Sequence, residues 1–298
     1  MSPLLQGILA ASQARTEERK KVRPEAELRR MIEDAPERRS LSRALQGRFT
    51  VIAEHKRRSP SGGEMVERNV ERALATYVKV SWISAVSVLT DEDYFKGSVW
   101  DLQAARASVD KPILRKDFIV DEYQVYEARA FGADAILLMA TLHAEDPARL
   151  AALFKLATEL GLEALVEIGM GSESPEKLAQ IVPEGAQIWG INARTFGGVF
   201  GFRAALSRLT TSLLGKDLRT SLKEHARLRA LIPKGCLAVA ESGLHTAKEL
   251  SVTKSLGYDA ALIGTAFLKG PKDIEQVVEE LSACPDLKGP SLPTARAS

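Results

Sequence analysis

Short apolar or β-branched runs recur along most of the chain, each followed by a polar residue and then by a segment with helical periodicity. The eight runs cover residues 50–53, 84–87, 112–114, 135–138, 164–166, 187–191, 237–240 and 260–263. Seven steps separate Glu54, after the first run, from Gly264, after the eighth, so the mean step is 30 residues. A strand with its crossover helix has about this length. Eight such units predict an α/β fold, a (β/α)8 TIM barrel.

The two ends of the chain and one internal segment depart from this period. Residues 1–47 show helical periodicity and no strand-like run, which predicts an N-terminal extension of two helices. We expect the barrel over 48–285 and a disordered tail over 286–298, all within a single domain of 298 residues. Residues 195–236 form an insertion that should open at the carboxyl-terminal face, where barrels build their active sites.

Composition and charge exclude several classes of function. Lys and Arg number 41 against 39 Asp and Glu, and the basic clusters at 18–21 and 56–58 lack the interleaved aromatic residues of a nucleic-acid surface. Cys236 and Cys284 have neither disulfide-framework nor zinc-site spacing. No apolar run approaches the ~20 residues that span a membrane, and no signal peptide is evident. We expect a cytoplasmic protein with no metal and no nucleic-acid or membrane partner.

Charged and amide residues follow the apolar runs at the points where the strands should end. The set consists of Glu54, Lys56, Lys116, Glu167, Asn192 and Glu241. For any one of them, a structural ion pair or an exposed strand end would be an ordinary explanation. Buried unpaired charges are costly, however, and the carboxyl ends of barrel strands all meet at one face. The set as a whole therefore predicts an active site at that face.

Two glycine-containing turns follow the last two runs. Ser242-Gly243 and Gly264-Thr265 offer backbone N–H groups where barrels commonly bind a phosphate group. Lys56 and the Arg-rich, Gly-rich loop after it add positive charge. Ordinary loop chemistry is the alternative interpretation of these turns. Together they predict a small phosphorylated molecule as the substrate.

Several longer motifs resemble those of the indole-3-glycerol phosphate synthase family. They are IAEHKRRSPSG at 52–62, SVLTD at 87–91, PILRKDFIVD at 112–121, ALVE at 164–167, GIN at 190–192, AESG at 240–243 and LIGT at 262–265. The similarity covers about residues 50–275, and the helical N-terminus also fits the family.

This resemblance implies a carboxy-lyase that acts on 1-(2-carboxyphenylamino)-1-deoxyribulose 5-phosphate and yields indole-3-glycerol phosphate, CO₂ and water in tryptophan biosynthesis. No cofactor is implied. Lys116 would be the general acid at the ketone oxygen, and the neighbouring Lys56 would lower the pKa of Lys116. Glu167 and Glu54 would transfer protons during the loss of water and stabilise the cationic ring.

The resemblance also implies a set of binding residues. Lys56 would contact the carboxylate or the phosphate, while Asn192 and Glu241 would hold the departing hydroxyl and the lysines. The remaining positions implied in substrate or phosphate binding are Ser59, Phe118, Leu138, Arg194, Ser242, Gly243, Gly264 and Thr265. Phe118 and Leu138 would line the anthranilate pocket, with simple core packing as the alternative for Phe118.

Two loops differ from the family pattern, and two other functions stay open. Residues 168–174 replace the usual acidic or His-containing turn, and Ala193 stands where the family has a second Asn. One alternative function is that of a related barrel such as phosphoribosylanthranilate isomerase. This isomerase needs a Cys/Asp acid–base pair at its strand ends, and neither cysteine of this chain follows the first run. A barrel that only binds, without catalysis, is the other alternative. For the main function and for both alternatives, we expect a monomer or a weak homo-oligomer.

Overall fold

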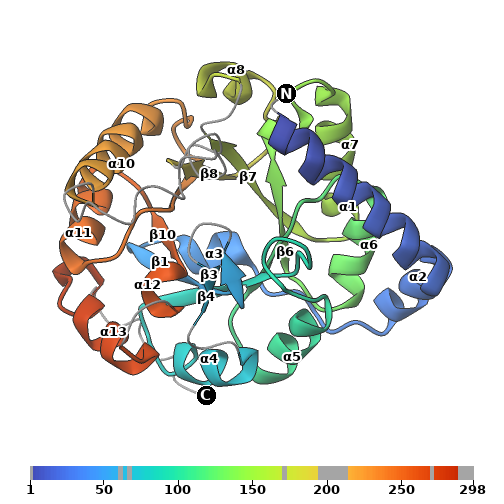
Figure 1. The fold of residues 1–298 in the computed structure, drawn as a ribbon, viewed down its shortest axis with the longest axis horizontal. Helices are drawn as coiled ribbons and strands as arrows, with labels where there is room; N and C mark the ends of the chain where they lie inside the picture. Colours follow the sequence, from blue (N-terminus) through green and yellow to red (C-terminus); the bar gives the residue numbers. More distant parts are fainter. Residues whose placement is uncertain are drawn as a thin grey trace, which may run out of the picture.

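Eight parallel strands close a barrel in the computed structural model, which describes residues 3–59, 63–65, 69–169, 173–193, 214–268 and 272–287. Around the barrel the order is β1-β10-β9-β8-β7-β6-β5-β4 (Figure 1). The strands are β1 Thr50–His55, β4 Ile83–Leu89, β5 Ile113–Lys116, β6 Ala135–Met139, β7 Glu163–Gly169, β8 Ile188–Asn192, β9 Leu237–Glu241 and β10 Ala260–Ile263. Each predicted run overlaps one of these strands, so the predicted TIM barrel is confirmed.

Helices surround the barrel, and their ends follow local sequence signals. They are α4 Val70–Tyr77, α5 Trp100–Ser108, α6 Glu122–Ala130, α7 Pro147–Glu159, α8 Pro175–Gln180, α10 Leu214–Arg229, α11 Ala247–Ser255, α12 Thr265–Leu268 and α13 Ile274–Leu281. Asp121, Thr246 and Asp273 each begin a helix with a capping box, which satisfies backbone N–H groups of the first turn. No helix among the described residues is long and apolar enough to cross a membrane.

Short elements complete the fold. The 3₁₀ helices η1 and η3 span Ala140–His143 and Pro285–Leu287. The strands β2 Arg58–Ser59 and β3 Gly63–Glu64 form a small antiparallel ribbon in the loop after β1. Because Leu287 is buried in η3, the predicted disordered tail cannot begin at 286, and residues 288–298 lie outside the described part of the chain.

Three helices precede the barrel, α1 Pro3–Val22, α2 Glu25–Glu33 and α3 Leu41–Leu45, so the expectation of two was wrong. The third has only five residues, which is too short to show a helical period in the sequence. Ser40 caps it and, together with Ser42, bonds to Glu163 at the start of β7. These bonds attach α3 to the amino-terminal end of the barrel.

The helix α1 runs along the opposite, carboxyl-terminal side of the barrel. Ser12 Oγ donates to the carbonyl of Phe118, just after β5, at 2.7 Å. The guanidinium of Arg15 lies 3.0 Å from the Asp91 carboxylate, in the loop after β4. Figure 1 shows α1 beside α6. The N-terminal extension thus covers the loops that follow β4 and β5.

Alternate residues of each strand pack on opposite sides of the barrel wall. In β6, Leu137 and Met139 belong to the cluster that fills the interior, whereas Ile136 and Leu138 pack outward in the cluster beneath the helices. The prediction that Leu138 lines a substrate pocket is therefore wrong. Both faces of a barrel strand are apolar, so the sequence pattern did not show which alternate residues point inward.

A buried ionic network holds the end of β5. The fully buried Arg115 guanidinium lies 2.8 Å from both the Asp117 and the Glu127 carboxylates. It also donates to Thr90 Oγ1 and to the carbonyl of Gln124. Burial alone would raise the pKa of Asp117, but the charges of Arg115 and Arg19 and the hydrogen bonds from Thr90 and Arg115 together outweigh burial and lower it. The network therefore joins β5 to the loop after β4 and to α6.

Replacing Arg115 by Met should destabilise the protein, because two carboxylates would stay buried with one guanidinium fewer. We expect the free energy of unfolding to fall by about 3–5 kcal/mol, measured by urea denaturation. Lys21→Met is the matched control, since Lys21 forms an exposed ion pair with Glu18 and its loss should not measurably shift the unfolding midpoint. Equal midpoints for the two variants would show that the network does not stabilise the fold.

Candidate active site

Five barrel strands bring the acids and bases of the sequence motifs to one mouth. Glu54 lies near the end of β1 and Glu167 lies within β7. Lys116, Asn192 and Glu241 are the last residues of β5, β8 and β9. Asn192 and Glu241 are also register partners in neighbouring strands. The mouth thus contains a compact group of charged side chains that are mostly buried.

Lys116 is the centre of this group. Its Nζ forms an ion pair with Glu241 Oε2 and lies 3.7 Å from Glu167 Oε2. On the β1 side of the mouth, Lys56 Nζ donates to Glu54 Oε1 at 2.5 Å. Two lysines are thus distributed among three carboxylates, and each lysine has at least one carboxylate partner.

The expectation that Lys56 lowers the pKa of Lys116 is wrong. Burial does lower the pKa of Lys116, but the neighbouring carboxylates outweigh burial and raise it above its ordinary value. These carboxylates belong to Glu241, Glu167 and Glu54. The charge of Lys56 is itself compensated by its bond to Glu54. Lys116 is therefore an ammonium ion at neutral pH.

The surroundings of Glu167 favour its uncharged form, whereas those of Lys116 favour its charged form. Burial and the nearby charge of Glu241 raise the pKa of Glu167 to about 8, against the opposing effects of Lys116 and a hydrogen bond with Asn192. Two buried carboxylates beside one ammonium cannot both ionise at low cost. At neutral pH the Glu167–Glu241 pair consequently retains a proton, and Glu167 can act as an acid.

Two glycines leave room for these carboxylates. A Cβ atom on Gly190 in β8 would lie 2.1 Å from Glu241 Oε1, and one on Gly264 would lie 2.3 Å from Glu54 Oε1. Contacts this short are not tolerated, so any side chain at either position would displace a carboxylate. Gly190 was missed by the sequence analysis, although a glycine inside a strand commonly marks a close approach of this kind.

The loops implied in phosphate binding lie side by side after β9 and β10. These strands pair directly, with Glu241 beside Leu262. Ser242 and Gly243 both have left-handed backbone angles, with φ of +70° and +74°. Gly264 immediately precedes Thr265, the first residue of α12. The two turns are therefore neighbours at the mouth.

Other predicted binding residues have different surroundings. Phe118 is 7% exposed and packs against Tyr94 and Phe95, with ring centroids 5.9 and 6.2 Å apart. Tyr94 and Phe95, which follow β4, were not among the predicted binding residues. The backbone of Ser59 pairs with Gly63 in the β2–β3 ribbon. Arg194 lies outside the described residues.

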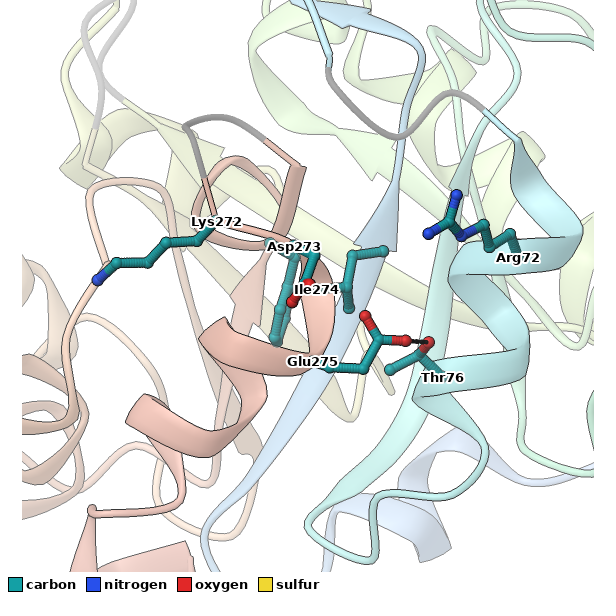
Figure 2. A pocket seen from close by; sticks show the side chains of 7 residues that line it. Arg72, Thr76, Lys272, Asp273, Ile274 and Glu275 are labelled. Atoms are coloured by element: carbon teal, nitrogen blue, oxygen red, sulfur yellow. Dashed lines mark hydrogen bonds between the residues drawn. The ribbon is translucent and has the colours of Figure 1, made fainter.

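A separate small pocket of about 110 Å³ lies between α4 and α13 (Figure 2). It is lined by Arg72, Thr76, Phe267, Lys272, Asp273, Ile274 and Glu275. Thr76 Oγ1 donates to Glu275 Oε1 at 2.7 Å, which joins the two helices across it. None of the acids and bases at the mouth lines this pocket.

The fold and the mouth define a (β/α)8-barrel enzyme with an acid–base site at the carboxyl ends of its strands. A crystal structure of 3-hexulose-6-phosphate synthase has the same fold, with a TM-score of 0.52 and 15% identity over 80% of this chain and 99% of that one. A family model for indole-3-glycerol phosphate synthase matches residues 5–199.

Curated relatives match over almost their whole length. The indole-3-glycerol phosphate synthase of Roseiflexus sp. (strain RS-1) is 37% identical over 94% of this chain and 98% of its own. That of Chlorobium phaeovibrioides is 37% identical over 87% of this chain and 92% of its own. The chain belongs to the indole-3-glycerol phosphate synthase family, a family of carboxy-lyases of tryptophan biosynthesis. The resemblance in the motifs is thereby confirmed, and the isomerase alternative loses its support.

Gly190→Ala should impair turnover because the added methyl group would push Glu241 away from Lys116. A displacement of about 1 Å at a reacting centre can cost roughly 10²-fold in kcat. Gly169→Ala is the matched control, since a Cβ atom there would lie at ordinary contact distances, 3.4 Å or more, from its neighbours. Steady-state kinetics of both variants would test this, and equal kcat values would argue against a spatial role for Gly190.

Proposed function

We propose that this chain converts 1-(2-carboxyphenylamino)-1-deoxyribulose 5-phosphate to indole-3-glycerol phosphate, CO₂ and water. The observation that carries the proposal is the Lys116 ammonium held beside Glu167 and Glu241 at the mouth of the barrel. Membership of the synthase family supports the same reaction. The reaction needs an acid at a ketone oxygen and an acid–base pair for the loss of water, and these residue types can supply both.

Ring closure would use Lys116. The aromatic carbon that carries the carboxylate attacks the ketone carbon, a C–C bond forms, and the ketone oxygen takes a proton from the Lys116 ammonium. The positive charge on Lys116 stabilises the negative charge that develops on this oxygen. Loss of CO₂ then returns the bonding electron pair to the ring and removes the positive charge on the ring nitrogen.

Loss of water would use two carboxyl groups of different charge. Glu167, which retains a proton at neutral pH, donates it to the departing hydroxyl. Glu54, held as a carboxylate beside Lys56, accepts the proton from the adjacent ring carbon. Among the described residues Glu241 Oε1 has no hydrogen-bond partner, so it can accept a hydrogen bond from the substrate hydroxyl, alongside the amide of Asn192.

The substrate would lie across the mouth, with its phosphate on the β9–β10 side and its aromatic ring towards Phe118. Lys56 can contact the substrate carboxylate or phosphate as its partner Glu54 changes protonation. The phosphate would be received by backbone and side-chain groups of Ser59, Ser242, Gly243, Gly264 and Thr265, with Arg194 as a further candidate. We propose a cytoplasmic protein, supported by the scarcity of cysteine, and a monomer or weak homo-oligomer.

The direct test is to mix the purified protein with the carboxyphenylamino-deoxyribulose phosphate and follow the fluorescence of the indole product. We expect continuous turnover without an added metal or organic cofactor. A protein that binds the substrate without turning it over would be the non-catalytic barrel considered above.

Lys116→Met should still fold, with lower stability because Glu167 and Glu241 lose their charged partner, and its kcat should fall by at least about 10²-fold, the usual contribution of a positioned general acid. Lys155→Met, which alters an exposed lysine on α7, is the control and should turn over as the wild type does. Thermal unfolding of both variants would separate loss of activity from loss of fold. A Lys116→Met protein with wild-type kcat would remove this residue from the mechanism.

Glu167→Gln should lower kcat with little change in KM, because the amide can still form hydrogen bonds but cannot donate an acidic proton. With a pKa of about 8, the wild-type carboxyl is protonated below that pH and loses its proton above it. The wild-type kcat/KM should therefore fall as the pH rises through about 8, and the residual activity of Glu167→Gln should not. A rise in KM alone would instead make Glu167 a binding residue.

A further inference from the structure

His225 is a buried residue of α10 that the reaction above does not use. Its imidazole packs edge-on against the ring of Tyr258, with centroids 5.5 Å apart. Nε2 of His225 lies 3.4 Å from the carbonyl oxygen of Ser242, and Nδ1 lies 3.4 Å from the Tyr258 hydroxyl. The Tyr258 hydroxyl donates to the His225 carbonyl at 2.9 Å. The imidazole is thus held between the helix and the turn that follows β9.

The direction of the bond to Ser242 follows from the chemistry of the two groups. Burial lowers the pKa of His225, so the imidazole is neutral at neutral pH and has a single N–H group. A carbonyl oxygen can only accept a hydrogen bond, which assigns the proton to the nitrogen that faces it. His225 therefore donates through Nε2 to the Ser242 carbonyl.

This bond also determines where the next N–H group points. The peptide bond between Ser242 and Gly243 is trans, so its C=O and N–H point in opposite directions. When the carbonyl is turned outward to α10, the Gly243 N–H is turned away from α10 and towards the mouth. Ser242 needs such support, because a left-handed φ of +70° is unfavourable for any residue with a Cβ atom.

We propose that His225 is a positioning residue for the phosphate of the substrate: its bond to the Ser242 carbonyl holds the Gly243 N–H towards the phosphate. This inference rests on the phosphate site proposed above. His225 acts through the Ser242–Gly243 peptide and does not itself touch the substrate. Its loss should weaken phosphate binding and leave the proton transfers at β5 and β7 unchanged.

Two amide variants test the proposal with matched polarity. In His225→Gln the side-chain NH₂ is as many bonds from Cβ as Nε2 is in His, so it can reach the Ser242 carbonyl. In His225→Asn the NH₂ is one bond shorter and cannot. We expect His225→Asn to raise KM roughly five-fold, the effect of one lost hydrogen bond, with kcat within about two-fold of wild type. His225→Gln should restore most of the wild-type KM.

Inhibition by inorganic phosphate provides a second measurement. In His225→Asn the inhibition constant of phosphate should rise by about the same factor as KM. In His225→Gln it should stay near the wild-type value. The role of His225 would be overturned if both variants had the same KM and the same inhibition constant for phosphate, or if kcat fell at constant KM. Either result would leave the proposed phosphate site itself in place. If phosphate does not compete with substrate in the wild type, and Gly243→Val leaves KM unchanged, the phosphate site itself is misplaced and this inference falls with it.

Discussion

The mouth of the barrel depends on one ammonium ion among buried carboxylates. Without Lys116, Glu167 and Glu241 would lie together in a site largely closed to water, at a cost of several kcal/mol. One positive charge cannot neutralise both, so the pair retains a proton at neutral pH. The ammonium ion therefore stabilises the site, while burial and the second carboxylate leave the pair with an acidic proton. A charged lysine and a protonated carboxyl group coexist because the negative charge of the carboxyl groups keeps the lysine protonated, whereas the single charge of the lysine does not outweigh the burial of both carboxyl groups.

This charge arrangement also constrains the backbone around it. Gly190 and Gly264 have no side chain because carboxylate oxygens occupy the space where a Cβ atom would lie. The end of β5, which carries Lys116, is fixed from outside by the buried Arg115 network. The helix α1 adds a further restraint through the bond from Ser12 to the loop after β5. Rigid placement of this kind keeps the lysine within reach of both partners.

Binding and chemistry are assigned to different sectors of the barrel. The proton transfers are proposed at β1, β5 and β7, whereas the phosphate is proposed at the turns after β9 and β10. Charge dominates the first sector, and backbone direction dominates the second, where Ser242 adopts a left-handed conformation beside His225. Because the proton transfers use side chains and the phosphate is bound largely by backbone groups of the turns after β9 and β10, a change in one set can alter KM or kcat without altering the other.

The sequence alone determined the eight strands, their order and the residue types at their ends, because a parallel barrel buries short apolar runs at a regular spacing. It did not fix the inward or outward direction of Leu138, since both faces of its strand are apolar. It gave the wrong direction for the pKa of Lys116, which depends on distances to carboxylates from other strands. It gave no sign of His225, whose contact with the turn after β9 arises only when α10 packs against the barrel. Local pattern specified the elements, and only their packing decided which charges and backbone groups meet.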